Sequence, residues 1–418
     1  MVNDWGLPGA KGAVANLPHR GKVRREGWRP PPYPYDGLSG LMELAQHHDG
    51  GAVDLSVGTP CDPPSKAVLE AFSIKALLAT SGGYPASIGS LGFRRSAAGW
   101  IHRRFGVELP ADAVAACVGT KELVAGLPAW LALRSQDPNR TVVLYPEISY
   151  PTYAMGAELA GMQAVPVPCD ELGRLDLSQV SDDDAARAML LWVNSPSNPT
   201  GALSDLGSAA RWGRERGVVV ASDECYVELT WTGRRRSILQ EGLEGLLAVH
   251  SLSKRSNMAG LRVGFYAGDP ELVGYLSEVR KHAGLMVPGP VQLAAIVALD
   301  DDEHVELQRQ IYKERLELFS QALSCHGLNA PMPDGGFYIW ASCSPEPAES
   351  DISNGGPLPS WELARWLAEV AGCVVAPGDL YGETASFHVR VAMVQPIERL
   401  ELAVNRMRLA GSHCSTRQ

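Results

Sequence analysis

The strongest constraint on the fold is an alternation of short β-branched runs and longer helical stretches between residues 112 and 268. Helical windows separate most of these runs, which is typical of a largely parallel sheet with helices on both faces. Ligands of such sheets bind at the carboxyl ends of the strands, so we expect functional residues directly after them. The seven candidate strands are residues 113–118, 141–144, 164–167, 188–193, 218–222, 246–250 and 263–267.

The pattern becomes helical beyond residue 290. Apolar side chains recur at spacings of seven, four, three and four, which predicts one long helix with a single apolar stripe. Asp300 to Asp302 precede this stripe and are expected to supply an N-cap and negative charge at the helix start. The stripe consists of Val305, Tyr312, Leu316, Phe319 and Leu323.

The C-terminal part of the chain predicts a second, smaller α+β domain. Short strands are expected at residues 337–340, 374–375 and 388–391, with a helix at 361–370. Residues 344–359 are rich in Pro, Ser, Glu and Gly and are expected to form a surface excursion. We therefore expect an N-terminal arm (1–35), a small domain (36–60 and 300–418) and a large domain (61–299).

Composition excludes several classes of protein. The chain has 418 residues and a net charge of −10, which argues against the basic face of a nucleic-acid-binding protein. Residues 1–30 lack the apolar core of a signal peptide, and no apolar run approaches the roughly 20 residues that span a bilayer. The eight scattered cysteines favour reduced thiols and a cytoplasmic location. His47 and His48 are adjacent and cannot share a helix face, so no metal site is expected.

A set of polar residues follows the predicted strands in a characteristic order. Asn198 follows the run at 188–193, Asp223 closes the run at 218–222, and Tyr226 comes three residues later. Lys254 follows the run at 246–250, and Arg262 lies eight residues further on. These residue types fit the needs of pyridoxal 5′-phosphate. A lysine can form a Schiff base, a buried aspartate can keep the pyridine nitrogen protonated, and Asn198 with Tyr226 can donate to the phenolate oxygen.

The phosphate group of this cofactor requires positive charge, hydroxyls and backbone amides. Arg262 supplies the charge, and Ser251 and Ser253 supply hydroxyls. The turn that contains Thr120 and Lys121 lies between a predicted strand and a helix, so it can offer amides at a helix N-terminus.

The order N-P-T-G, S-D-E-x-Y, S-x-S-K and a later arginine resembles the class I/II aminotransferases of fold type I, from about Asp54 to Met407. The resemblance implies an α/β fold with a mostly parallel seven-stranded sheet, and a homodimer with active sites at the subunit interface. It assigns Lys254 to the Schiff-base position, Asp223 to the pyridine nitrogen, and Asn198 and Tyr226 to the phenolate oxygen.

The same resemblance assigns four further residues. Tyr150 matches the aromatic residue that stacks on the cofactor ring, and Tyr84 matches the tyrosine that reaches the neighbouring subunit's phosphate. Arg390 matches the arginine that binds the substrate α-carboxylate bidentately. Gly58 lies in the stretch 54–60 and is expected, with Asn198, to contact the substrate.

Several stretches, above all SLSKRSNMAG at 251–260, look similar to N-succinyldiaminopimelate aminotransferases. This implies transfer of an amino group from glutamate to N-succinyl-2-amino-6-ketopimelate. The chain departs from that subgroup at 86–93 and at Asp334-Gly335-Gly336, where this fold receives the substrate side chain. Elimination, replacement or oxidation of an amino acid by the same scaffold therefore stays open. A transcription regulator built on this fold would need an added DNA-binding domain, which 35 residues cannot supply.

Overall fold

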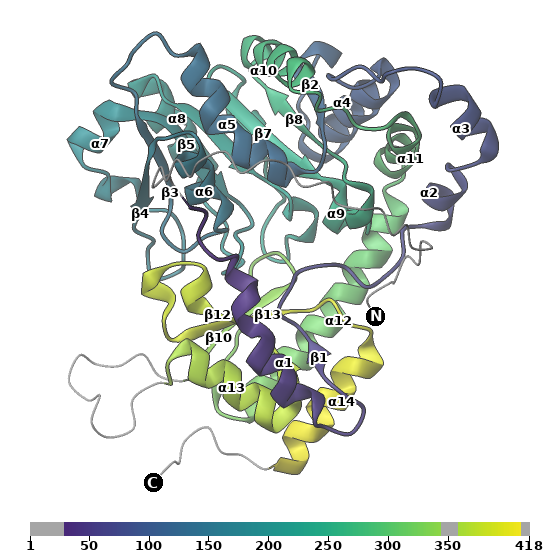
Figure 1. Ribbon diagram of the computed structural model, residues 1–418, viewed down its shortest axis with the longest axis vertical. Helices are drawn as coiled ribbons and strands as arrows, with labels where there is room; N and C mark the ends of the chain where they lie inside the picture. The colour runs from purple at the N-terminus through teal and green to yellow at the C-terminus, as the bar shows by residue number, and fades with distance from the viewer. Residues whose placement is uncertain (1–28, 344–357, 411–418) are drawn as a thin grey trace, which may run out of the picture.

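The computed structural model describes residues 29–343 and 358–410. Residues 1–28 of the expected N-terminal arm and residues 344–357 of the expected surface excursion lie outside the described residues. A large α/β body forms the upper part of Figure 1, and a smaller body with α1 (Ser39–Gln46), α13 (Ser360–Ala371) and α14 (Ile397–Ala410) lies below it.

The large body contains a seven-stranded sheet, and every predicted strand is present. Six strands point in the same direction, whereas β8 is antiparallel to both of its neighbours, β2 and β7. The connection from β7 to β8 contains only α9 (Leu252–Arg255) and the 3-10 turn Ala259–Leu261, neither of which is long enough to cross over the sheet, and the chain returns antiparallel. In spatial order the strands are β2 (Val114–Cys117), β8 (Gly264–Gly268), β7 (Leu246–Ser251), β6 (Val219–Asp223), β5 (Ala188–Asn194), β3 (Val142–Pro146) and β4 (Gln163–Val167).

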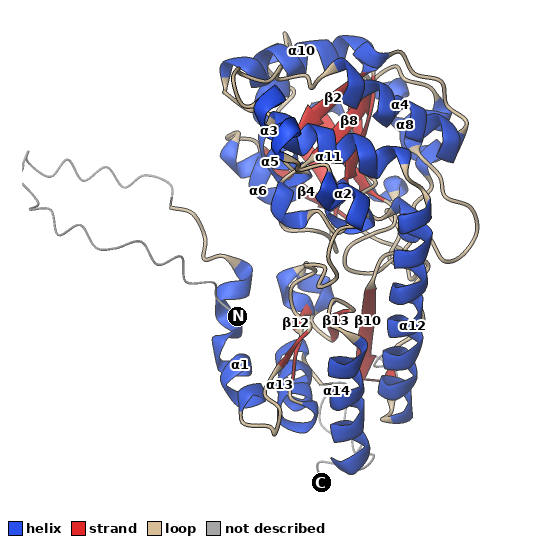
Figure 2. Ribbon diagram, turned by 90° about the vertical axis from the view of Figure 1, so that its right-hand side faces the viewer, coloured by secondary structure: helices blue, strands red, loops and turns tan. Residues whose placement is uncertain are grey.

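Helices cover both faces of this sheet, as Figure 2 shows. Because neighbouring strand residues point to opposite faces, Val220 and Ala248 pack on one side while Ala221 and Leu247 pack on the other. The first face is covered by α4 (Leu91–Phe105), α8 (Leu206–Arg216) and α11 (Gly289–Asp300). The second face is covered by α5 (Thr120–Arg134), α6 (Thr152–Leu159) and α10 (Pro270–His282). The short helices α2 (Lys66–Glu70), α3 (Ile74–Thr80) and α7 (Asp182–Arg187) lie outside these layers.

The smaller body has its own hydrophobic cluster, which includes Leu41, Ile339, Leu367 and Val404. The expected short strands and helix are present, together with two-residue strands that sequence patterns did not indicate. We propose the domain division expected above, with the small domain at 36–60 and 300–418, because this cluster is separate from those on the large sheet. One sheet has the order β12 (Ala376–Pro377), β13 (His388–Ala392), β10 (Tyr338–Cys343), β9 (Leu328–Asn329), and β1 (Val53–Asp54) pairs with β11 (Cys373–Val374).

One helix, α12 (Glu303–Cys325), runs from the large body into the small one (Figures 1 and 2). Its 23 residues correspond to a length of about 34 Å. Every residue of the predicted apolar stripe is buried, which confirms the helical periodicity. The helix begins at Glu303, and Asp302 at the N-cap makes no side-chain capping bond. Asp301, within the predicted acidic run, bonds the first amides instead, since its Oδ1 accepts hydrogen bonds from the backbone amides of Glu303 (2.9 Å) and His304 (3.3 Å).

Candidate active site

A cavity of about 410 Å³ lies at the carboxyl ends of β5, β6 and β7, bordered by residues of the small body. Such a volume suits a small ligand. The structure brings nearly all of the predicted site residues together in its wall. They are Gly58, Thr120, Lys121, Tyr150, Asn198, Asp223, Tyr226, Ser251, Ser253, Lys254, Arg262 and Arg390.

Lys254 lies directly after β7, on the single turn α9 (Leu252–Arg255). Ser251 begins this turn, because its Oγ accepts a hydrogen bond from the amide of Ser253 at 3.1 Å. The lysine Nζ donates to the carbonyl oxygen of Gly58. Burial lowers the pKa of Lys254 to about 8, and the positive charges of Arg390 and Arg262 act in the same direction. A substantial fraction of this amine is therefore uncharged, and nucleophilic, in mildly alkaline solution.

Asp223 is the last residue of β6 and its carboxylate is buried. Oδ2 accepts a hydrogen bond from the hydroxyl of Tyr153 at 2.9 Å, and Oδ1 accepts one from the amide of Cys225 at 3.2 Å. Burial raises the pKa of Asp223, and these two donors oppose that rise. A cationic ring nitrogen in the cavity would stabilise the buried carboxylate further, so the group fits the pairing expected from the sequence.

The N-terminus of α5 forms an anion cradle. Gly119 precedes the helix with φ of 72°, and no side chain caps the first amides. The guanidinium of Arg262 packs against Gly119, and the left-handed φ of this residue favours glycine. Free helix amides beside a guanidinium are suited to a phosphate group. The amine, the carboxylate and this cradle line one cavity, so the residues present fit pyridoxal 5′-phosphate.

Arg390 lies on the opposite wall, on β13, and is 2% exposed. Its Nη1 donates to Asn198 Oδ1 at 2.8 Å, and its Nη2 donates to the carbonyl of Ser56 at 2.5 Å. Rings of three tyrosines surround the guanidinium, at 4.2 Å for Tyr338, 4.7 Å for Tyr381 and 5.9 Å for Tyr35. The cage fixes a planar cation whose nitrogens face the cavity, which suits bidentate binding of a carboxylate.

Four tyrosines that line the cavity were missed by the sequence analysis, and they are Tyr33, Tyr35, Tyr153 and Tyr338. Tyr338, on β10, brings its hydroxyl within 2.8 Å of that of Tyr226, and burial raises its pKa to about 12. Tyr35 lies close to Tyr381, with 2.9 Å between their hydroxyls. Alternation along the strand at 337–340 could have indicated that Tyr338 and Arg390 share a sheet face. Nothing in the Pro-rich segment around Tyr35 indicated a position beside residue 381.

Lys121 also has more than a backbone role in the cavity wall. Its Nζ donates to the hydroxyl of Tyr33 at 3.2 Å and lies 4.8 Å from the centre of that ring and 5.9 Å from that of Tyr150. The hydroxyls of Tyr150 and Tyr33 raise the pKa of Lys121 against the effect of burial, which is the largest single influence. Lys121 is therefore a further cation in the cavity wall, besides Arg262 and Arg390.

Tyr84 is the one predicted site residue that the structure does not bring to the cavity. It lies between α3 and α4 and is 98% exposed. The sequence assignment placed it at a neighbouring subunit, so its position within a single chain does not test that role.

In the described residues, 29–343 and 358–410, no group of three or more His, Cys, Asp or Glu side chains could hold a metal ion. His48 instead hydrogen-bonds through Nε2 to the carbonyl of Ala368 at 3.1 Å. No helix in that part of the chain combines the length and apolar character needed to cross a membrane.

Comparison with known proteins agrees with this geometry. The family model for aminotransferases of class I and II matches residues 51–407. A probable aminotransferase of Mycobacterium tuberculosis is 41% identical, over 95% of this chain and 92% of the relative. A 4-dedimethylamino-4-oxo-anhydrotetracycline transaminase of Streptomyces rimosus is 38% identical, over 90% and 99%. An LL-diaminopimelate aminotransferase of Aquifex aeolicus is 34% identical, over 90% and 96%.

The fold is also shared with solved structures. A probable N-succinyldiaminopimelate aminotransferase from Thermus thermophilus superposes with a TM-score of 0.78 and 30% sequence identity. The superposition covers 90% of this chain and all of the Thermus chain.

Proposed function

The chain belongs to the class I and II aminotransferases, and we propose that it binds pyridoxal 5′-phosphate on Lys254 and transfers an amino group between an amino acid and a 2-oxo acid. The observation that carries this proposal is the shared cavity. The Lys254 amine, the Asp223 carboxylate, the α5 anion cradle and the Arg390 guanidinium all line it.

In this proposal, different groups of cavity residues bind different parts of the cofactor. When bound, the cofactor supplies an electron sink for the carbanion that forms at the substrate α carbon. Asp223 holds a proton on the ring nitrogen, and Asn198 and Tyr226 donate hydrogen bonds to the ring oxygen. Arg262, with Ser251, Ser253 and the amides of Thr120 and Lys121, holds the phosphate. Tyr150 covers one ring face.

Lys254 acts as the general base. Its pKa of about 8 leaves Nζ able to accept the substrate α proton near neutral pH and to release a proton again. Arg390 binds the α-carboxylate and thereby fixes the α carbon near Nζ. Gly58, whose carbonyl oxygen accepts a hydrogen bond from Nζ, borders the same substrate space.

We propose glutamate as amino donor and N-succinyl-2-amino-6-ketopimelate as an acceptor. The Thermus structural relative carries the name of that reaction, and the LL-diaminopimelate relative acts, by its name, on a related diamino acid. The Streptomyces transaminase supports an acceptor from specialised metabolism instead. Elimination, replacement or oxidation on the same scaffold remains the alternative reaction.

We also propose a cytoplasmic homodimer in which Tyr84 contacts the neighbouring subunit's cofactor phosphate. Ile74 (76% exposed), Leu78 (79%) and Tyr84 (98%) present apolar surface on one segment of the large domain, and burial against a second subunit would remove it from water. Buried thiols such as Cys117 fit a reducing compartment. When Tyr84→Phe and Lys254→Ala subunits are mixed, hybrid dimers should form in which one active site contains both an intact Lys254 and an intact Tyr84. The mixture should therefore be more active than either variant alone.

An absorbance spectrum of the purified protein tests the central proposal. We expect a Schiff-base band near ~420 nm that is absent from Lys254→Ala. Glutamate should convert this band and release 2-oxoglutarate, after which a panel of oxo acids identifies the acceptor. A response only to amino acids that carry a leaving group, with no oxo acid formed from glutamate, would favour elimination or replacement.

A further inference from the structure

The three residues after Lys254, Arg255-Ser256-Asn257, contact the helices α11 and α12 rather than the cavity. Arg255 Nη2 donates to the carbonyl of Ala298, at the end of α11, at 3.2 Å. The hydroxyl of Ser256 lies 2.9 Å from His304 Nε2 on the first turn of α12. Asn257 Nδ2 donates to Gln308 Oε1, one turn further along α12, at 2.8 Å.

Asn257 is suited to this position by both its backbone and its amide. Its φ of 54° lies in the left-handed region, which asparagine tolerates better than most residues. Besides Gln308, its Nδ2 contacts the carbonyl of Pro63 at 3.3 Å, and its Oδ1 accepts from the Tyr312 hydroxyl at 3.4 Å. The side chain therefore joins the lysine-bearing turn to α12 and to the segment around residue 63.

Gln308 continues the connection to that segment. Its Nε2 donates to Asp62 Oδ2 at 2.9 Å. Arg315, two turns further along α12, holds the same carboxylate with bonds of 2.6 and 2.7 Å. Although burial raises the pKa of Asp62, the hydrogen bonds from Arg315 and Gln308 outweigh this and lower it, so the carboxylate stays charged.

These contacts close a ring through the cavity wall. Asp62 lies four residues after Gly58, and the carbonyl of Gly58 accepts the hydrogen bond from Lys254 Nζ. The ring therefore runs from Lys254 to Gly58, to Asp62, to Gln308, to Asn257 and back to Lys254. A Cβ on Gly58 would overlap with the Tyr338 hydroxyl, so the loop has little freedom to adjust on its other side.

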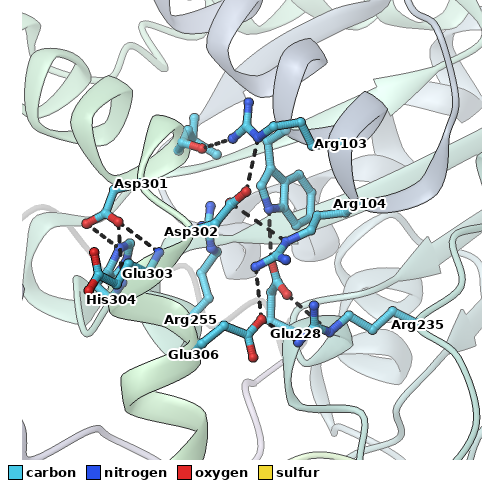
Figure 3. A network of polar contacts seen from close by, with 12 residues as sticks. Arg103, Arg104, Glu228, Arg235, Arg255, Asp301, Asp302, Glu303, His304 and Glu306 are labelled. Carbon is cyan, nitrogen blue, oxygen red and sulfur yellow. Dashed lines mark hydrogen bonds and ion pairs between the residues drawn. The ribbon is translucent and has the colours of Figure 1, made fainter.

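The start of α12 is itself held to the large body by a charge cluster (Figure 3). Asp302 accepts a hydrogen bond from Arg103 at 3.0 Å, and Glu306 accepts one from Arg104 at 3.3 Å. Glu306 also accepts one from Arg235 at 2.7 Å. Gln308 is thus held near a fixed end of α12, and Asn257 contacts it from the turn after Lys254.

We propose that Asn257 and Gln308 are positioning residues, which hold the loop of Gly58 over Lys254 through Asp62. This inference rests on the proposed function, in which Gly58 and Lys254 lie beside the substrate. When a hydrogen bond in this ring of contacts is removed, the loop at residues 55–64 moves away from Lys254 more often. The substrate then adopts its reactive position beside Lys254 less often.

The test uses Asn257→Gly, which keeps the left-handed backbone, Gln308→Ala and the double variant. Gln310→Ala is the matched control, since Gln310 lies on the same helix and its side chain donates a hydrogen bond to the exposed Glu314 rather than to a residue of the ring. Hydrogen–deuterium exchange of the purified holoenzyme should rise at both 55–64 and 252–258 in each ring variant and not in the control. KM for the amino acid should increase roughly three- to tenfold, with kcat changed less than about twofold.

The double variant should resemble either single variant, because both substitutions open the same ring. Additive increases in KM, or unchanged exchange at 55–64 when Gln308 is replaced, would overturn the proposal. Exchange needs no turnover. If the enzyme proves to lack a Schiff-base band, the proposed function fails while the exchange data still decide whether the ring holds the loop.

Discussion

The two walls of the cavity are built in different ways. The wall that contains Asp223 and Lys254 consists of residues directly after parallel strands, so the sheet fixes their positions. The opposite wall joins Tyr35, Tyr338 and Arg390, which come from distant parts of the chain. In the proposed function, the first wall binds the cofactor and the second wall binds the substrate.

Among the substitutions that compare the two walls, replacement of Arg390 by lysine should reduce activity the most. Lysine keeps the charge but loses the planar pair of donors, so two charge-assisted hydrogen bonds to the substrate cannot form together. We expect kcat/KM to fall by roughly 100- to 1,000-fold, which corresponds to about 3–4 kcal/mol. Steady-state kinetics measure the loss, and the ~420 nm band should persist.

Loss of that band in Arg390→Lys would contradict the assignment of different roles to the two walls, because it would mean that the second wall also holds the cofactor. Lys254→Ala provides the reference for complete loss of the band.

Substitution of Glu224 by glutamine probes the interior behind the first wall. Glu224 is buried, accepts from the Ile238 amide at 2.7 Å, and faces His250 Nε2 at 3.4 Å. Burial raises the pKa of Glu224 to about 7, and burial with the charge of Arg255 lowers that of His250 to about 3. Glu224 by itself therefore binds more protons in the folded protein than in the unfolded chain between about pH 4.5 and 7, so its contribution to the free energy of unfolding falls as pH rises through this window. His250 has the opposite effect between about pH 3 and 6.5, because its proton is bound more tightly in the unfolded chain.

Glutamine has no proton to lose, so this fall should be reduced in the variant. We expect Glu224→Gln to be about 2 kcal/mol more stable than the parent near pH 8, with little difference near pH 4. Thermal denaturation at a series of pH values measures the effect. Equal pH profiles for the two proteins would mean that Glu224 stays charged in the folded state.

Substitution of Tyr338 by phenylalanine should have the smallest effect of the three. It removes the hydroxyl that lies 2.8 Å from Tyr226 and keeps the ring that lies 4.2 Å from the Arg390 guanidinium. A single hydrogen bond contributes about 1 kcal/mol, so kcat/KM should fall about fivefold. A loss as large as that of Arg390→Lys would show that the hydroxyl, rather than the ring, controls the second wall.

The first wall could be predicted from the sequence because each of its residues is marked by the strand directly before it in the chain. Lys254 and Asp223 follow apolar strands, and strand ends converge at one edge of a parallel sheet. The direction of β8 could not be predicted, because hydrophobic periodicity identifies a strand but does not give its direction relative to its neighbours. The second wall was predicted only at Arg390 and Gly58. Tyr35 and Tyr338 reach the cavity through packing between segments far apart in the chain, which no local pattern encodes.

The pairing of β1 with β11 has a consequence for how the protein is made. Val53 has no strand partner until Cys373 has been synthesised, and the Tyr35 hydroxyl likewise waits for Tyr381. Cys373 follows Val53 by 320 residues and Tyr381 follows Tyr35 by 346, which at ribosomal speed is roughly 15–70 s. The N-terminal segment must therefore remain soluble and unpaired while the large sheet folds behind it. This is a period in which a chaperone or a protease would encounter the exposed segment.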